Sequence, residues 1–279
     1  MEKDHLKYLV NLAASLSEAT HEYYKKAGNK YTEVPEIVGI TGACENVDTL
    51  FGVGNRLQLP LFLTQTGQLA LEQVLQYFPA VYTTLLSGRD EEIEDERHLR
   101  QFRLTEEEFD WSLVGTHGEQ YDEEKMYEAL LSHIENAVKY IAQKTITDNR
   151  ETLEYHYQRN TTNLMEGLQL PFLRISYEEA LGALRKNGFP ELQWGDDLKA
   201  NHEATIVQLL NGASLNRPVF IMRYPKEIKF FSMKVSEKDA RVVLSADLIF
   251  PVAGEGIGSA VREHRGDMLK ERLLNSTMF

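Results

Sequence analysis

The sequence predicts an α+β fold in which helices flank an antiparallel sheet. Strand-like and helix-like segments follow one another without the strict alternation that is typical of parallel α/β proteins. Two strand-like runs, AVYTTLLSGRDE and RQFRLTEEEFDW, are joined by one acidic loop, which favours an antiparallel pair. Apolar side chains recur every three or four residues in two long segments, residues 4–27 and 122–145, and this spacing predicts two long helices.

The first part of the chain predicts a helix, two strands and a second helix. The helix over residues 4–27 is amphipathic, and Gly28 is a typical stop signal. The segment KYTEV predicts a short strand that ends at Pro35, and LPLFLT predicts a buried strand. In GQLALEQVLQYF the large apolar residues fall on one helical face, so we expect a helix there.

The second part of the chain predicts two helices and three strands. After the helix over 122–145, residues 146–170 are polar and poorly periodic, and we interpret them as an insertion or a linker. SYEEALGALRKNG predicts a helix that stops at Gly188. RPVFIMRYP, IKFFSMKV and ARVVLSADLIF predict three more strands.

Composition excludes several classes of protein. The chain has 279 residues, of which 42% are hydrophobic and 26% are charged, which is ordinary for a globular protein. Its net charge of -13 argues against a main role in gripping a phosphate backbone. Cys44 is the only cysteine, so a cytoplasmic location is expected, and no apolar run is long enough for a membrane span.

The acidic loop GRDEEIEDERHL is the first candidate site. Its six carboxylates repel one another, so a solvated loop is the simplest interpretation. The alternative is an anion site, because the guanidinium groups of Arg89 and Arg97 match phosphate oxygens and His98 can donate to a third oxygen. Glu91 could then fix an arginine or a metal ion. Phe102, on the return strand, could stack on a purine.

The segment ADLIFPVAGEGIGSAVREHR is the second candidate. Asp247 and Glu255 lie eight residues apart on either side of a turn rich in proline and glycine. Such oxygen ligands suit a magnesium ion that bridges a nucleotide phosphate. The glycines let a backbone approach a ligand closely. Arg262 opens the run REHR, which could equally be a charged strand end or the start of a helix.

The third candidate combines GACENVDTLF with FLTQTGQLALEQ. Glu45, Gln68 and Glu72 could together recognise an amino group and a polar side chain. The histidines are scattered and the single cysteine has no CxxC partner, so neither a zinc site nor a thiol enzyme is supported.

Together these segments resemble the catalytic domain of class II aminoacyl-tRNA synthetases of the asparaginyl type, and most closely its archaeal relative, the AMP-forming asparagine synthetase. YTEVPEI resembles the first motif, which builds a dimer interface, and CENVDTLF resembles the flexible substrate loop. FLTQTGQLALE is similar to the asparagine-type segment. GRDEEIEDERHLRQFRLTEEE resembles the second motif, and WGDDL, YPKEIKFF and GEGIGSAVREHR are also similar to asparaginyl-type segments.

The resemblance implies roles for the candidate residues. Arg89 would contact the reacting α-phosphate, with Glu91 as a second catalytic residue. The implied ATP-binding residues are Arg89, Arg97, His98, Leu99 and Phe102. The implied amino-acid-binding residues are Glu45, Gln68, Glu72 and Arg262, with Glu45 on the α-amino group and Arg262 on the side chain. Asp247 and Glu255 would bind Mg²⁺.

The resemblance also implies a function and an organisation. We expect one catalytic-type domain over residues 1–279, without an anticodon-binding domain and without the third motif of the family. The main hypothesis is an AMP-forming ligase that makes asparagine from aspartate, ammonia and ATP. The alternatives are the catalytic core of an asparaginyl-tRNA synthetase, or a non-catalytic paralogue that binds amino acid or nucleotide. We expect a homodimer, and we do not expect tRNA as a partner.

Overall fold

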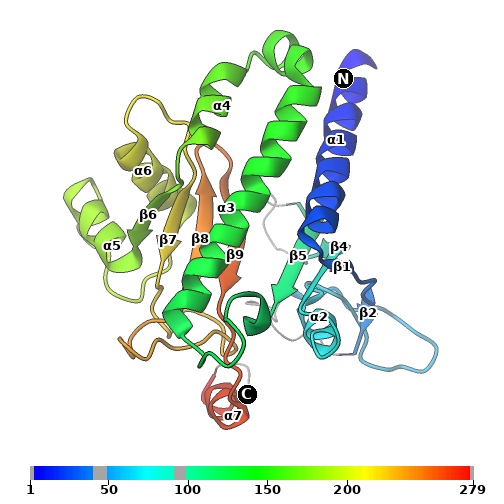
Figure 1. Cartoon of the computed structure of the whole chain (residues 1–279), viewed down its shortest axis with the longest axis vertical. Helices are drawn as coiled ribbons and strands as arrows, with labels where there is room; N and C mark the ends of the chain where they lie inside the picture. Colours follow the sequence, from blue (N-terminus) through cyan, green and yellow to red (C-terminus); the bar gives the residue numbers. More distant parts are fainter. Residues whose placement is uncertain (1–2, 40–48, 91–98, 277–279) are drawn as a thin grey trace. The chain divides into compact units, whose positions relative to one another are not determined.

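The computed structural model describes residues 3–39, 49–90 and 99–276 (Figure 1). The chain forms two compact units, each assembled from separate stretches of sequence. Unit 1 contains Met1–Tyr23, Glu123–Lys229 and Met233–His264, and unit 2 contains Tyr24–Asp122, Phe230–Ser232 and Arg265–Phe279. Each unit has a sheet of its own.

Unit 1 is built around a four-stranded sheet with the order β6-β7-β8-β9. The strands are β6 (Leu173–Ser176), β7 (Val219–Met222), β8 (Ser245–Phe250) and β9 (Gly254–Ala260). β6 and β7 run parallel, whereas β7 with β8 and β8 with β9 are antiparallel pairs. The register places Asp247 opposite Gly258, and it shifts between Leu248 and Ile249.

Helices cover both faces of this sheet. They are α3 (Glu123–Asp148), α4 (Thr161–Gln169), α5 (Tyr177–Lys186) and α6 (Ala200–Asn211). α5 and α6 pack with Val219 and Ile221, while α3 and α4 pack with Phe220 and Leu248. Successive strand residues point to opposite faces, so a strand covered on both sides is largely apolar. This pattern explains why β7 and β8 could be predicted from sequence.

α1 (Lys3–Ala27) contributes a long, largely exposed helix. Polar contacts join it to α3: the Tyr140 hydroxyl donates to Glu22 Oε1 at 2.7 Å. Apolar side chains of α1 remain about half exposed, namely Leu6, Leu9, Val10 and Leu16. The predicted helix and its stop at Gly28, which has a φ of +89°, are confirmed.

Unit 2 contains a three-stranded sheet with the order β1-β4-β5. Its elements are β1 (Lys30–Tyr31), β4 (Ala80–Gly88), β5 (Gln101–Phe109), α2 (Gln68–Val74), the 3₁₀ turn Trp111–Leu113 and α7 (Gly266–Leu274). β2 (Ile37–Val38) and β3 (Phe62–Leu63) form a separate antiparallel pair. β4 and β5 pair antiparallel from Ala80 opposite Phe109 to Gly88 opposite Gln101, as the sequence predicts.

The predicted α+β class, with antiparallel sheets flanked by helices, is confirmed, but several segments differ from expectation. LPLFLT, predicted as a buried strand, forms only the two half-buried residues of β3, and α6 was not predicted. IKFFSMKV is not a regular strand, since Met233 and Val235 form only isolated bridges. The glycine-rich run after the turn forms β9. Residues 146–170 contain the end of α3, a π-helical turn over Thr152–His156 and α4, so they are more regular than their composition predicts. The expectation of a single catalytic-type domain stays a prediction.

Candidate functional site

Arg89 and Phe102 are held together at the end of the β4–β5 pair in unit 2. The Arg89 backbone N–H donates to the Arg100 carbonyl at 2.9 Å, so the ladder continues one residue beyond β4. Phe102 lies on β5 opposite Ser87. The guanidinium Cζ of Arg89 lies 5.8 Å from the centroid of the Phe102 ring. A forked cation beside an aromatic face can bind a phosphate and stack a base.

Gly88 allows close packing beside this pair. A Cβ on Gly88 would come within 2.9 Å of Leu63 Cδ2 and 3.1 Å of Phe51 Cδ2. A cavity of about 370 Å³ opens here, and the residues that line it are Phe51, Val53, Leu63, Arg100 and Gln101. Three of these five lining residues are apolar, and Arg100 is a cation. Neither Phe51 nor Leu63 of β3 was predicted as a site residue, because a single apolar residue carries no mark of a ligand site.

The start of α2 presents a carboxamide and a carboxylate side by side. Gln68 Nε2 donates to Glu72 Oε1 at 2.6 Å, one helical turn along. Glu106 on β5 fixes this turn, since its Oε2 accepts from the backbone N–H of Gly67 at 2.7 Å and from the Thr66 hydroxyl at 3.1 Å. An amide next to a carboxylate can discriminate between an amide and an acid ligand. Glu106 was not predicted, because it belongs to a run of three glutamates on β5.

Asp247 and Glu255 in unit 1 approach one another across the β8–β9 pair. A Cβ on Gly258 would lie 3.3 Å from Glu255 Oε1 and 3.8 Å from Asp247 Oδ1, so both oxygens border the space that this glycine leaves open. Within the described ranges, no group of three or more His, Cys, Asp or Glu side chains is placed to hold a metal ion. Mg²⁺, however, is commonly bound by one or two carboxylates plus substrate phosphates. The pair therefore fits a magnesium ion that a nucleotide helps to bind.

Lys229 and Tyr224 complete this cluster. Lys229 Nζ donates to Asp247 Oδ2 at 2.8 Å and lies 4.2 Å from the centroid of the Tyr224 ring. Burial raises the pKa of the Tyr224 hydroxyl well above its ordinary value, and the charges of Asp247 and Glu255 raise it further. The phenol therefore stays neutral. Neither Lys229 nor Tyr224 was predicted as a site residue, although both lie in the segment YPKEIKFF.

The residue before Tyr224, Arg223, has a strained backbone conformation. Arg223 has a φ of +58°, which is uncommon for a residue other than glycine. Its Nη2 lies 2.6 Å from Glu124 Oε2, and its Cζ lies 5.0 Å from the centroid of Tyr127. The Arg223 backbone N–H and the Tyr127 hydroxyl both donate to the Ser245 carbonyl, at 2.8 and 2.6 Å. These contacts hold the backbone in a conformation that costs free energy on its own.

The sequence matches the family described as tRNA synthetases class II (D, K and N) over residues 1–278. The chain belongs to this family.

Curated relatives and solved structures agree with this assignment. Asparagine–tRNA ligases from Thermococcus gammatolerans and Desulforamulus reducens are 32% and 33% identical, over 97% and 95% of this chain. The structure of asparaginyl-tRNA synthetase from Pyrococcus horikoshii complexed with asparaginyl-adenylate is 31% identical, with a TM-score of 0.83 over 96% of this chain. This class II synthetase chain spans 57% and 56% of the length of the two ligases, and 57% of the solved chain.

These relatives correct two expectations about partners. The expectations that tRNA is not a partner and that ammonia is the nucleophile are wrong, because the relatives are asparagine–tRNA ligases. A net charge of -13 does not exclude a nucleic-acid partner, because a sum over the chain does not describe the local distribution of charge. The same relatives favour the alternative function, the core of an asparaginyl-tRNA synthetase, over asparagine synthesis.

The remaining predicted residues of this class II synthetase chain divide into three groups. Glu45, Glu91, Arg97 and His98 lie outside the described residues. Leu99 is 64% exposed. Arg262 follows β9 and forms an isolated bridge with Met233. Because Arg262 belongs to unit 1 while Gln68 and Glu72 belong to unit 2, their grouping in one pocket stays a prediction. The homodimer also stays a prediction.

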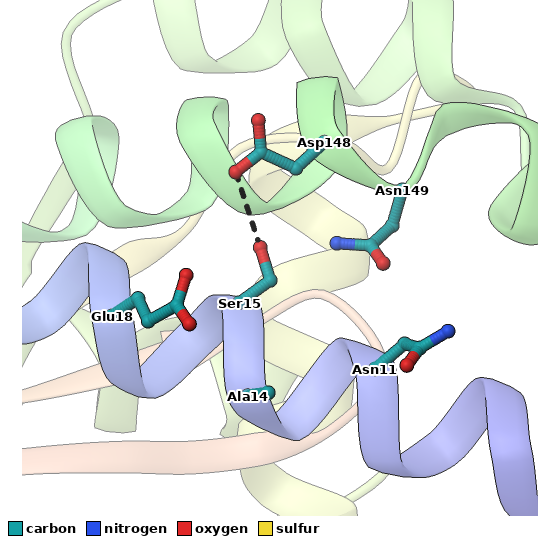
Figure 2. A pocket seen from close by; sticks show the side chains of 6 residues that line it. All are labelled: Asn11, Ala14, Ser15, Glu18, Asp148 and Asn149. Atoms are coloured by element: carbon teal, nitrogen blue, oxygen red, sulfur yellow. Dashed lines mark hydrogen bonds between the residues drawn. The ribbon is translucent and has the colours of Figure 1, made fainter.

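A polar cavity of about 310 Å³ lies between α1 and the end of α3 (Figure 2). Its lining residues are Asn11, Ala14, Ser15, Glu18, Asp148 and Asn149. The Ser15 hydroxyl donates to Asp148 Oδ2 at 3.4 Å across the cavity. None of the residues predicted to bind a ligand lines it. In the described part of the chain, no helix is long and apolar enough to cross a membrane.

Proposed function

We propose that this chain activates asparagine with ATP to form asparaginyl-adenylate, as the catalytic core of an asparagine–tRNA ligase. The observation that carries the proposal is the likeness to the Pyrococcus horikoshii synthetase complexed with asparaginyl-adenylate, over 96% of this chain. In the reaction an oxygen of the asparagine α-carboxylate attacks the α-phosphorus of ATP, and pyrophosphate leaves. The acyl group then passes to a hydroxyl of tRNA, and AMP is released.

Arg89 and Phe102 would bind the nucleotide. The Arg89 guanidinium would neutralise charge that develops on the α-phosphate, and a donor fixed in advance by the β4–β5 ladder needs little reorganisation during the reaction. Phe102 would stack on adenine at the edge of the same pair. Arg97, His98 and Leu99 would contact the rest of ATP, and Glu91 would orient Arg89.

Gln68 and Glu72 would select the amino acid. The Glu72 carboxylate accepts hydrogen bonds from amide N–H groups, as it does from Gln68 Nε2 at 2.6 Å. An asparagine side chain presents such donors, whereas an ionised aspartate presents only acceptors. Glu72 would therefore favour asparagine over aspartate. Glu45 would meet the α-amino group, and Arg262 would contact the side-chain carbonyl oxygen.

Asp247 and Glu255 would hold Mg²⁺ in this proposal. When bound, the ion would supply positive charge to the phosphate oxygens of ATP. The residues of the chain provide the two carboxylates, and Gly258 provides the open space between them. The proposal requires that the ion be shared with the nucleotide, since two carboxylates leave most of its coordination sites to water and phosphate.

The decisive experiment is ATP–pyrophosphate exchange with asparagine and aspartate in parallel. We expect exchange that depends on asparagine and is weaker by at least about tenfold with aspartate, since a buried polar group left unpaired costs about 1–3 kcal/mol. Exchange that prefers aspartate would overturn the assignment of the substrate. Exchange with neither, together with thermal stabilisation by asparagine or ATP, would favour the non-catalytic paralogue. Transfer to an asparagine-accepting tRNA is then measured with the same preparation.

A further inference from the structure

Lys229 places a positive charge against the carboxylate pair Asp247 and Glu255. Its Nζ lies 2.8 Å from Asp247 Oδ2, and the side chains of Lys229 and Asp247 are only 9% and 8% exposed. A buried ammonium is costly unless a carboxylate compensates it. The ion pair is therefore a buried, structural part of the cluster, unlike the exposed ion pairs on the surface of the unit.

An aromatic ring holds the same ammonium in place. Lys229 Nζ lies 4.2 Å from the centroid of Tyr224, whose side chain is 2% exposed. Attraction between a cation and a ring strengthens when both are removed from water. Tyr224 is in turn fixed by the neighbouring residue Arg223, which is held at a φ of +58°. Lys229 Nζ thus contacts both the Tyr224 ring and the Asp247 carboxylate.

The Asp247 carboxylate forms hydrogen bonds with Lys229 and with the Tyr224 hydroxyl, and it also borders the space at Gly258. Oδ2 accepts from Lys229, while Oδ1 and Glu255 Oε1 border the open space at Gly258, 3.8 and 3.3 Å from the position of a Cβ there. The formal charges of Lys229, Asp247 and Glu255 sum to one negative charge, whereas the two carboxylates alone carry two. The pair is thus partly neutralised before any ligand arrives.

We propose that Lys229 is a counter-cation that weakens the binding of a free divalent metal to Asp247 and Glu255, so that the metal binds tightly only together with nucleotide phosphates. The inference rests on the proposed function, from which it takes the metal site. The affinity of oxygen sites for such cations follows the number of charged ligands. An ammonium near the ion also repels it more strongly than it would in bulk water. Phosphate oxygens restore the missing negative charge.

Binding of Mn²⁺ to the nucleotide-free chain tests this role, with the free ion followed by electron paramagnetic resonance. Lys229→Met is expected to bind Mn²⁺ at least about tenfold more tightly than the unaltered chain, because the repulsion is removed. Lys229→Arg keeps the charge and is expected to bind as weakly as the unaltered chain. Lys226→Met removes the same charge from an exposed position nearby and is the matched control, with no change expected.

Unchanged or weaker Mn²⁺ binding by folded Lys229→Met overturns the proposal. If that variant does not fold, Lys229→Gln replaces it, because glutamine keeps a hydrogen-bond donor for Asp247. Lys229→Gln is also expected to bind Mn²⁺ more tightly, and unchanged or weaker binding would overturn the proposal. Glu255→Gln, measured with ATP present, tests the metal site by itself and is expected to weaken Mn²⁺ binding. If Glu255→Gln leaves Mn²⁺ binding unchanged, the metal site itself is refuted. If Glu255→Gln weakens Mn²⁺ binding but Lys229→Met does not strengthen it, only the role of Lys229 as a counter-cation is refuted.

Discussion

The guanidinium of Arg89 lies 5.8 Å from the centre of the Phe102 ring, at the open end of the β4–β5 pair. The first prediction follows from this contact. Arg89→Ala is expected to lower ATP–pyrophosphate exchange by on the order of 100-fold or more, which is typical for the loss of a charge that meets the transition state. Arg89→Lys is expected to recover only part, since an ammonium lacks the fork.

Arg103 provides the matched control for Arg89. It is an exposed arginine of β5, next to Phe102 in sequence and opposite Leu86 in the pair. Arg103→Ala removes the same charge and is expected to keep exchange near that of the unaltered chain. Equal losses in both variants would mean that the charge of the unit matters and that Arg89 has no special contact with ATP.

The second prediction concerns Gln68, which is 8% exposed and donates to Glu72. Gln68→Ala is expected to lower kcat/KM for asparagine by about 10- to 100-fold, because a buried partner left unpaired costs about 1–3 kcal/mol. KM for ATP is expected to stay constant. Gln73→Ala, at an exposed position on the same helix, is the control. A rise in KM for ATP alone would contradict the assignment of Gln68 to the amino acid and would indicate that it contacts ATP.

The third prediction compares two glycines of β9. A Cβ on Gly258 would lie 3.3 Å from Glu255 Oε1, whereas a Cβ on Gly256 would lie 2.5 Å from Phe250 Cε2. Gly258→Ala is expected to raise the Mg²⁺ concentration needed for exchange with little change in Tm. Gly256→Ala is expected to lower Tm, since overpacking costs about 1–3 kcal/mol. Calorimetry and a Mg²⁺ titration of both variants measure this, and the reverse pattern would contradict the metal site.

The fourth prediction concerns acid stability. The guanidinium of Arg241 forms hydrogen bonds with Asp239 and lowers the pKa of that carboxyl to about 2, from an ordinary value of 3.8. Because the folded-state pKa is depressed, the pair stabilises the fold above pH 3.8, and this contribution is lost as the pH falls toward 2. The urea midpoint of Asp239→Ala is therefore expected to lie below that of the unaltered chain at neutral pH and to converge with it in acid. A constant difference would refute the linkage.

The helices α1, α2, α3 and α5 and the doubly covered strands β7 and β8 could be predicted from sequence, because the positions that they bury recur in a regular order of apolar residues. No helix was predicted where α4, α6 and α7 lie. β7 and β8 bury both faces, so VFIM is apolar throughout and SADLIF is apolar except at Ser245 and Asp247. β9 could not be predicted, since GEGIGSA offers a single large apolar side chain, Ile257, and shows no period. Its strand conformation depends on pairing with β8, which is a tertiary interaction.

The candidate site could be predicted only where its residues are close in sequence. Arg89 and Phe102 flank one loop, and Asp247 and Glu255 flank one turn, so each pair follows from local topology. Lys229 pairs with Asp247 across 18 residues, and nothing in its neighbourhood marks it as a buried cation. The long separation of such partners is the reason that pattern alone misses them.

The interleaving of the two units along the sequence has a consequence for folding during synthesis on the ribosome. The first 23 residues pack in the unit that continues only at Glu123, after the contiguous stretch Tyr24–Asp122 has been made. At about 5–20 residues per second, roughly 100 residues of synthesis leave the helix without α3 for on the order of 5–20 s. During that interval Glu22 and Tyr23 lack the α3 residue Tyr140, which both of them contact in the folded chain.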